Sequence, residues 1–193
     1  MHHIYHTEGL ILGSKDSGET GKYYAIFTRD LGMINASAQG VRKMSSKLRY
    51  VLQDFSYIKL DLVRGKDFWR LTNASKTNQL ENILKRSEAL TVFGNITRLL
   101  RRLLAGEYPN EDLFKDVLNG LSILEKADSK EEFQNIEVIM VLRILSNLGY
   151  ISGEELYENL TKSPFEGNLI FEISKNRSKI LSEINKALKE THL

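Results

Sequence analysis

The chain has 193 residues with a formal net charge of +2, and 41% of them are hydrophobic, so it can bury a core in one or two domains. It contains no cysteine, which excludes disulfides and thiolate chemistry. It also contains no long apolar run and no charged-then-apolar leader, so we expect no membrane span and no signal peptide. We therefore expect a cytoplasmic location. Residues 1–80 contain 12 basic and 7 acidic side chains, against 15 and 18 in the rest, so an anionic partner is expected for the N-terminal part.

Two local patterns near the N-terminus resemble ligand sites, and we interpret neither as one. His2, His3 and His6 lie close together, but a metal site needs further ligands at fixed geometry. Residues 18–22 resemble a nucleotide-binding phosphate loop, yet Asp16 occupies the place of its first glycine, and the segment leads into a predicted strand where that motif requires a helix. We therefore expect no metal and no cofactor.

Short β-prone runs with turn residues between them fill the N-terminal part, and glycine and polar residues at 13–18 predict a break after the first run. The predicted strands are residues 5–12, 22–28, 33–38, 54–63 and 68–72. Five such strands in a small antiparallel barrel are typical of the OB-fold, which presents one face to single-stranded nucleic acid. Aromatic side chains in and beside these strands can stack on bases, although about half must face the core. These aromatics are Tyr23, Tyr24, Phe55, Tyr57, Phe68 and Trp69.

A basic segment follows the third predicted strand. It contains Arg42, Lys43, Lys47 and Arg49 with no acidic residue, interleaved with serines. Lys and Arg charges together with Ser hydroxyls and backbone amides can track a phosphate backbone. The alternative is a solvated surface loop.

From about residue 77 the hydrophobic period becomes helical. The predicted helices cover about 89–104, 110–121, 130–148, a short stretch from 152 to 163, and 178–190. Ser152 and Glu155 form a predicted capping box, and Asn168 to Ile173 a predicted brief strand. The chain is thus predicted to be α+β in two parts: an OB-fold nucleic-acid-binding domain over residues 1–76 and a helical partner-interaction domain over residues 77–193.

Two sets of cations lie on these helices. Arg98, Arg101 and Arg102 share one face, which either contacts DNA or complements the dipole at the C-terminal end of the helix. Arg143 interrupts an apolar run, and it is either ion-paired with a neighbouring helix or placed at the lip of a groove that receives an acidic partner.

The order of several short motifs resembles the RecO family of recombination mediators over about residues 4–150. The N-terminal motifs are Thr7 to Leu12, Gly18-Glu19, Phe27 to Arg29 with Leu31-Gly32, Ala38 to Lys43 with Ser46 to Leu48, and Arg64 to Lys66. The helical motifs are Leu113-Phe114, Leu142 to Leu145 and Leu148 to Tyr150.

This resemblance implies an OB-fold that binds single- and double-stranded DNA and anneals strands. It also implies contact with the tail of the single-stranded-DNA-binding protein and joint action with RecR to load RecA. Arg42, Lys43, Lys47 and Arg49 match the position of the family's basic DNA-facing segment, whereas zinc is excluded at residues 151–155 because the family's cysteines are missing there.

We therefore expect a non-enzymatic DNA repair mediator. A generic OB-fold RNA-binding protein and a helical interaction scaffold with a non-binding barrel are the alternatives. No constellation of His, Ser and Asp and no phosphate loop supports an enzyme.

Overall fold

The computed structural model describes residues 3–151, 155–165 and 167–190. The chain forms two compact units. The first contains Met1–Glu81 and Leu104–Glu111, and the second contains Asn82–Leu103 and Asp112–Leu193. The strands lie in the first unit, which we call the barrel unit, and the α-helices in the second, the helical unit.

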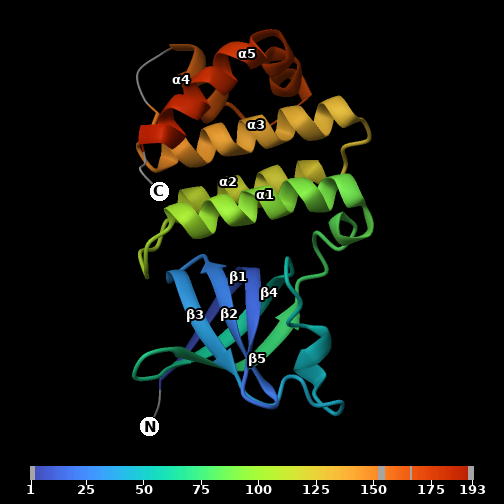
Figure 1. Ribbon diagram of the computed structural model, residues 1–193, viewed down its shortest axis with the longest axis vertical. Helices are drawn as coiled ribbons and strands as arrows, with labels where there is room; N and C mark the ends of the chain where they lie inside the picture. The colour runs from blue at the N-terminus through green and yellow to red at the C-terminus, as the bar shows by residue number, and fades with distance from the viewer. Residues whose placement is uncertain (1–2, 152–154, 166, 191–193) are drawn as a thin grey trace. The chain divides into compact units, whose positions relative to one another are not determined.

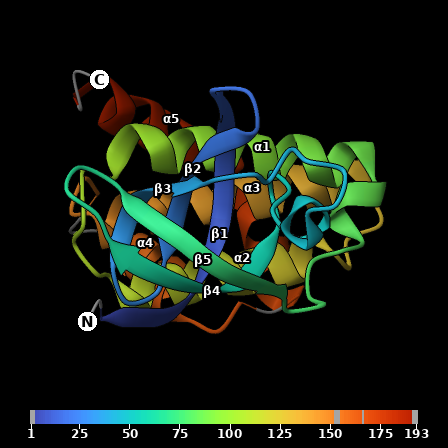
Figure 2. The same cartoon turned by 90° about the horizontal axis from the view of Figure 1, so that it is seen from below.

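The strands close into a barrel with the order β1-β2-β3-β5-β4 (Figure 2). They are β1 (Ile4–Ser17), β2 (Gly21–Thr28), β3 (Gly32–Ala38), β4 (Tyr57–Arg64) and β5 (Trp69–Lys76). The long β1 closes the barrel because its first half pairs with β4 and its second half pairs with β2. Alternate residues of the strands point into one apolar core, which includes Ile26, Ile34, Leu60 and Leu62. The predicted five-stranded OB-fold followed by helices is confirmed.

The predicted break at residues 13–18 is wrong, because β1 continues to Ser17. The register between β1 and β2 shifts by one residue between Ile11 and Gly13, where a β-bulge takes up the extra residue. Gly13 therefore marks a bulge within the strand, and the reversal comes only at the turn after Ser17.

The helical unit contains five α-helices within the described residues, and α3 lies between α1 and α5 (Figure 1). The helices are α1 (Ser87–Leu103), α2 (Glu111–Leu124), α3 (Lys130–Asn147), α4 (Glu155–Lys162) and α5 (Gly167–Glu190). α3 is buried on nearly every side, which explains its almost continuous apolar run. The predicted capping box at Ser152 lies outside the described residues.

The predicted strand over 168–173 is wrong, since these residues belong to α5. Leu169 and Ile173 are both buried, and their spacing of four residues places them on one face of a helix with Ile180 and Ile184. A short β-prone run thus continues the apolar stripe of a long helix, and tertiary packing overrides its local preference.

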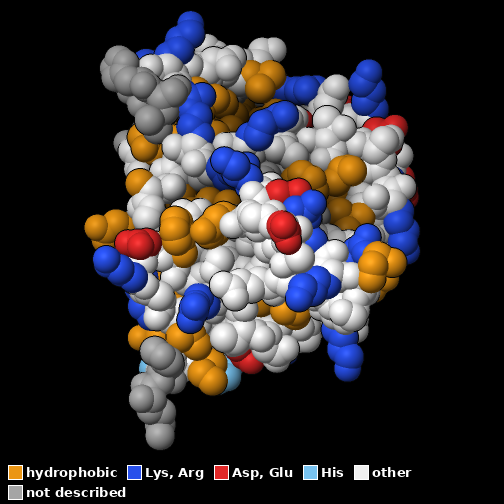
Figure 3. Space-filling model, turned by 60° about the horizontal axis from the view of Figure 1, so that its bottom comes forward, with side chains coloured by type: hydrophobic (Ala, Val, Ile, Leu, Met, Phe, Trp, Pro, Cys, Tyr) orange, Lys and Arg blue, Asp and Glu red, His pale blue; other side chains and the backbone are white. Residues whose placement is uncertain are grey.

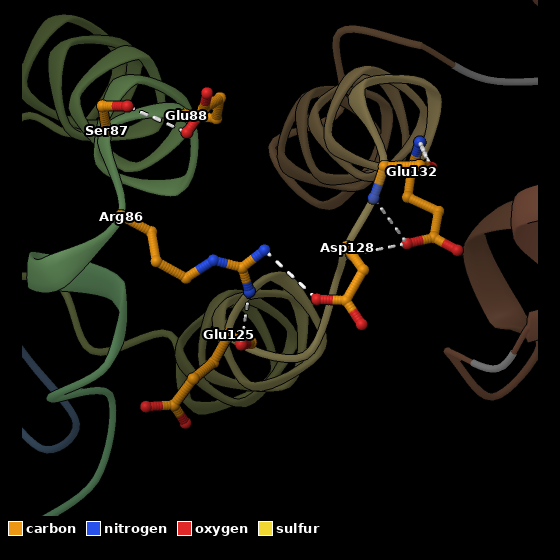
Figure 4. Close-up of polar contacts among 7 residues, drawn as sticks. Arg86, Ser87, Glu88, Glu125, Asp128 and Glu132 are labelled. Atoms are coloured by element: carbon orange, nitrogen blue, oxygen red, sulfur yellow. Dashed lines mark hydrogen bonds and ion pairs between the residues drawn. The ribbon is translucent and has the colours of Figure 1, made fainter.

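Polar contacts join the start of α1 to the connection between α2 and α3 (Figure 4). The guanidinium of Arg86 donates to the Glu125 carbonyl (3.2 Å) and to the Asp128 carboxylate (3.3 Å). Ser129 and Glu132 form a capping box at the start of α3. The contacts satisfy backbone groups that a helix terminus otherwise leaves open.

The connection between α1 and α2 belongs to the barrel unit. The Glu107 carboxylate accepts hydrogen bonds from the Trp69 indole (3.0 Å) and from Arg64. Gly32 starts β3 with φ +72°, and a Cβ there would lie 2.6 Å from the carbonyl carbon of Tyr108. Glycine at position 32 is therefore required both by the backbone angle and by close packing.

Candidate nucleic-acid interface

The basic segment, residues 42–49, lies in the connection between β3 and β4, which contains a short 3-10 helix, η1 (Lys47–Tyr50). Val41 and Leu52 flank the segment and are both buried in the barrel core, while Leu48 and Val51 pack against that core. These apolar anchors hold one side of the connection to the barrel. The cations Arg42, Lys43, Lys47 and Arg49 are all exposed on its other side.

The cations differ in how far neighbouring groups engage them. Arg42 lies 3.3 Å from the Asp16 carboxylate and donates to the Gly18 carbonyl (3.3 Å), so the β1–β2 turn partly neutralises it. Arg49 contacts the sulfur of Met44, a weak acceptor that leaves its charge intact. Lys43 and Lys47 form no ion pair within the part of the chain that the structure describes. These two lysines present the most available positive charge of the segment.

A cavity of about 610 Å³ lies between the basic segment and the β1–β2 turn. Asp16 and Asp54 line it together with three cations, Lys22, Arg42 and Arg49, so its walls carry charges of both signs. Burial raises the pKa of the Tyr24 hydroxyl at its wall to about 12. The cations outnumber the carboxylates, so the charge of the cavity wall is positive on balance.

The structure separates five of the six predicted aromatics into two groups, while the sixth, Phe55, is half-buried in the connection between β3 and β4. Tyr24, Tyr57 and Trp69 are all buried, and Tyr24 and Trp69 belong to the barrel core. Tyr23 is 37% exposed and Phe68 is 46% exposed, and their ring centroids lie 5.0 Å apart. Of these five, Tyr23 and Phe68 can receive a base without first being uncovered.

Arg98, Arg101 and Arg102 are exposed on α1, as their spacing predicts. Arg102 donates to the Leu188 carbonyl at the end of α5 (3.5 Å). Arg98 donates to the side chain of Asn95. The three cations share a surface of the helical unit, so the two predicted basic sets belong to different units.

Arg143 is buried, with only 5% of its side chain exposed. Its Nη1 lies 3.3 Å from the Asp116 carboxylate in α2, its Nε donates to the Leu160 carbonyl (3.2 Å), and its Nη2 donates to the Ser163 carbonyl. The structure thus shows the ion pair with a neighbouring helix, which was one of the two alternatives. A contact of Arg143 with an acidic partner stays a prediction.

Sequence reasoning missed two features of this surface. The acidic partner of Arg42, Asp16, lies near the end of β1, far from Arg42 in the sequence. Lys15 and Arg70 are exposed on β1 and β5 beside the aromatic pair, which only the strand register reveals. Lys and Arg side chains are spread across the face shown in Figure 3, with few acidic side chains between them.

Within the described residues, no group of three or more His, Cys, Asp or Glu side chains could hold a metal ion. The same part of the chain contains no helix long and apolar enough to span a bilayer.

A closed five-stranded barrel with an outward-facing basic segment defines an OB-fold protein with an appended helical unit. Residues 1–80 match the family model described as "Recombination protein O N terminal", and residues 84–151 match "Recombination protein O C terminal". The chain belongs to the RecO family.

The chain is similar to proteins named DNA repair protein RecO. The one from Rubrobacter xylanophilus is 27% identical over 147 residues, covering 76% of this chain and 58% of the relative. The one from Desulfitobacterium hafniense is 28% identical over 150 residues, covering 76% and 52%. The one from Acetivibrio thermocellus is 27% identical over 144 residues, covering 75% and 57%. The chain thus spans a little over half the length of these relatives.

Proposed function

We propose that this protein is a non-enzymatic mediator of DNA repair and recombination that binds single- and double-stranded DNA and promotes strand annealing. The observation that carries the proposal is the basic segment, whose exposed cations are held on the barrel by buried anchors on both sides. Fixed cations neutralise phosphates and release counterions, so two strands can approach closely enough for base pairing to select the product. No chemical catalyst is required for that process.

The proposed partners follow from membership of the RecO family. They are RecR, the tail of the single-stranded-DNA-binding protein and, indirectly, RecA. The helical unit is the proposed place for the protein partners, and its exposed set Arg98, Arg101 and Arg102 is a second proposed DNA contact. Arg143 would reach an acidic tail only by giving up its internal hydrogen bonds, so the geometry favours a positioning role for it.

Fluorescence anisotropy of a labelled single-stranded oligonucleotide, measured over a salt series, tests the DNA-binding proposal. Each phosphate contact to a single strand contributes about 0.7 to the slope of log affinity against log salt. Changing Arg42, Lys43, Lys47 and Arg49 together to Ala should therefore reduce the slope by about 2.8 if all four touch phosphates. The reduction should be about 1.4 if only the two unpaired lysines do.

A matched control removes four exposed lysines of the helical unit and should leave the slope unchanged. These are Lys85, Lys115, Lys126 and Lys130. A second variant, Asp16→Asn, releases Arg42 from its carboxylate partner and should tighten binding. Equal slopes for wild type and the basic-segment variant would contradict the proposed contact.

Competition between DNA and RNA of the same sequence separates this proposal from a generic RNA-binding barrel. A wild-type protein that binds neither at moderate salt would support the interaction scaffold instead.

A further inference from the structure

The basic segment contains one thioether, that of Met44, and this side chain is 80% exposed. The other methionines that the structure describes are far less accessible, since Met33 in β3 is half-buried and Met140 in α3 is only 2% exposed. The chain contains no cysteine, so no thiol competes with the Met44 sulfur for an oxidant. Met44 is therefore the methionine that a dissolved oxidant reaches first within the described residues.

Backbone turns hold Met44 beside a cation of the segment. The Ser46 amide donates to the Lys43 carbonyl (3.0 Å), and the Arg49 amide donates to the Ser46 carbonyl (3.3 Å). These consecutive turns bring Nη1 of Arg49 to 2.8 Å from the Met44 sulfur. The exposed sulfur thus faces a guanidinium that we have proposed as a phosphate contact.

Oxidation of the sulfur would change this contact from a weak one to a strong one. A thioether sulfur is a weak hydrogen-bond acceptor, whereas a sulfoxide is polar and carries partial negative charge on its oxygen. In the reaction with hydrogen peroxide, the O–O bond breaks and one S–O bond forms. The sulfur gives up two electrons, and the peroxide is reduced to water. The new oxygen is added to the atom that already faces Arg49, which can donate a charge-assisted hydrogen bond to it.

We propose that Met44 is a site of reversible oxidation by a peroxide, and that its sulfoxide weakens DNA binding by the basic segment. The inference rests on the proposed DNA binding and adds a control over it. The sulfoxide oxygen takes up donors of Arg49 that would otherwise bind a phosphate, and its partial negative charge repels the phosphate itself. Methionine sulfoxide reductases restore the thioether, so the change is reversible.

The size of the effect follows from how much of the segment depends on Met44. Lys43 and Lys47 form no ion pair within the described residues, and oxidation leaves their charge and that of Arg49 unchanged. The loss is therefore that of about one hydrogen-bonded contact. We expect an affinity for single-stranded DNA that is lower by about threefold, within the range that one ordinary hydrogen bond gives.

The test treats the full chain with increasing amounts of hydrogen peroxide and locates the added oxygen by peptide mass spectrometry. Met44 should be oxidised before Met33 and Met140, and a bound single-stranded oligonucleotide should slow its oxidation. Fluorescence anisotropy of the same samples should show the affinity falling by about threefold as Met44 is oxidised. Treatment with methionine sulfoxide reductase should restore it.

Three variants assign the effect to the contact between Met44 and Arg49. Met44→Leu retains an apolar side chain without sulfur, so its affinity should be the same before and after peroxide. Met44→Gln places a carbonyl oxygen near the guanidinium and should weaken binding without any peroxide. Arg49→Ala removes the donor, so peroxide should cause little further loss. Met33→Leu is the matched control, and it should respond to peroxide as the wild type does.

Circular dichroism verifies that each variant and the oxidised protein are folded. Earlier oxidation of another described methionine, or oxidation of Met44 that leaves the affinity unchanged, would overturn the inference while leaving DNA binding in place. A loss of affinity that persists in Met44→Leu would do the same. If the wild type binds no DNA before treatment, the proposed function fails, and the control by oxidation fails with it.

Discussion

Replacing Arg143 with Met tests whether this buried cation positions three helices. The side chain in α3 connects Asp116 of α2 to the Leu160 and Ser163 carbonyls at the end of α4, and its guanidinium carbon lies 4.9 Å from the ring centroid of Phe165. The last carbonyls of a helix have no partner within the helix, so Arg143 satisfies groups that would otherwise be left open. Met has a similar length and retains most of the packing.

The expected loss follows from what the substitution leaves behind. Removing one member of a buried ion pair costs about 3–5 kcal/mol, because the other charge stays buried without compensation. Asp116 is 28% exposed and can regain part of its hydration, so the lower end applies. We expect the helical unit to lose about 3 kcal/mol of unfolding free energy.

The pH dependence supplies a second, independent result. Burial raises the pKa of Asp116, and the charge of Arg143 offsets this in part. Without Arg143 the pKa rises further, so the carboxyl becomes neutral at a higher pH. A raised folded-state pKa contributes stability at low pH that is lost as the pH rises through it. The difference in unfolding free energy between Arg143→Met and wild type should therefore become smaller as the pH is lowered from 7 towards 4.

Urea unfolding followed by two signals separates the two units. The single tryptophan, Trp69, lies in the barrel unit, whereas the far-ultraviolet circular dichroism is dominated by the helical unit. The circular dichroism transition should shift while the fluorescence transition stays in place. Arg101→Met, an exposed change in the same unit, should cost less than about 0.5 kcal/mol. Two results would refute the reasoning: a loss of unfolding free energy below about 1 kcal/mol for Arg143→Met, or a difference from wild type that grows as the pH is lowered.

Three further results are expected. In urea unfolding, Gly32→Ala should lower the unfolding free energy of the barrel by more than about 2 kcal/mol. Gly18 has φ +58° but open space around it, so Gly18→Ala should lower it by about 1 kcal/mol. Equal losses would contradict the close packing at Gly32. The pKa of Tyr24 is raised to about 12, so the stability that its hydroxyl contributes is present below pH 10 and falls as the pH rises towards 12. Urea unfolding at pH 9 and at pH 11 should show that Tyr24→Phe lacks this fall in unfolding free energy. The hydrogen bond with His6 lowers the pKa of Asp61, so the stability that this carboxylate contributes is present above pH 3.8 and disappears as the pH falls through the lowered value. Carboxyl NMR should show a higher pKa of Asp61 in His6→Ala. An unchanged pKa of Asp61 would exclude the contact.

The barrel could be predicted from the sequence because its signals are local. Each strand alternates over several residues, and turn residues such as Gly32 and Gly65 punctuate the runs. The prediction of secondary structure failed where the same residue type occurs in two kinds of local structure. Gly13 was interpreted as the end of a strand and is a bulge within it, and the β-prone run around Ile173 belongs to a long helix.

The basic segment could be predicted because its cations lie close together in the sequence. Which of them is neutralised by a carboxylate could not be predicted. Arg42 is partly neutralised by Asp16, which lies at the end of another strand. Likewise, the identity of the buried aromatics depends on which face each strand turns inwards. Tyr23 and Tyr24 are adjacent in sequence and lie on opposite faces of β2.

The bulge in β1 decides which side chains of β1 and β2 face one another near the turn that joins them. Before it, Ile11 pairs with Ile26; after it, Lys15 pairs with Tyr23. Had the earlier register continued, Lys15 would lie opposite Lys22, and two like charges would face each other at the β1–β2 turn. The one-residue shift instead places a cation beside an exposed ring, in line with Ser37 and Arg70. The pairing of Lys15 with Tyr23 thus depends on a feature that the sequence shows only as a glycine, and that becomes visible once the strands are paired.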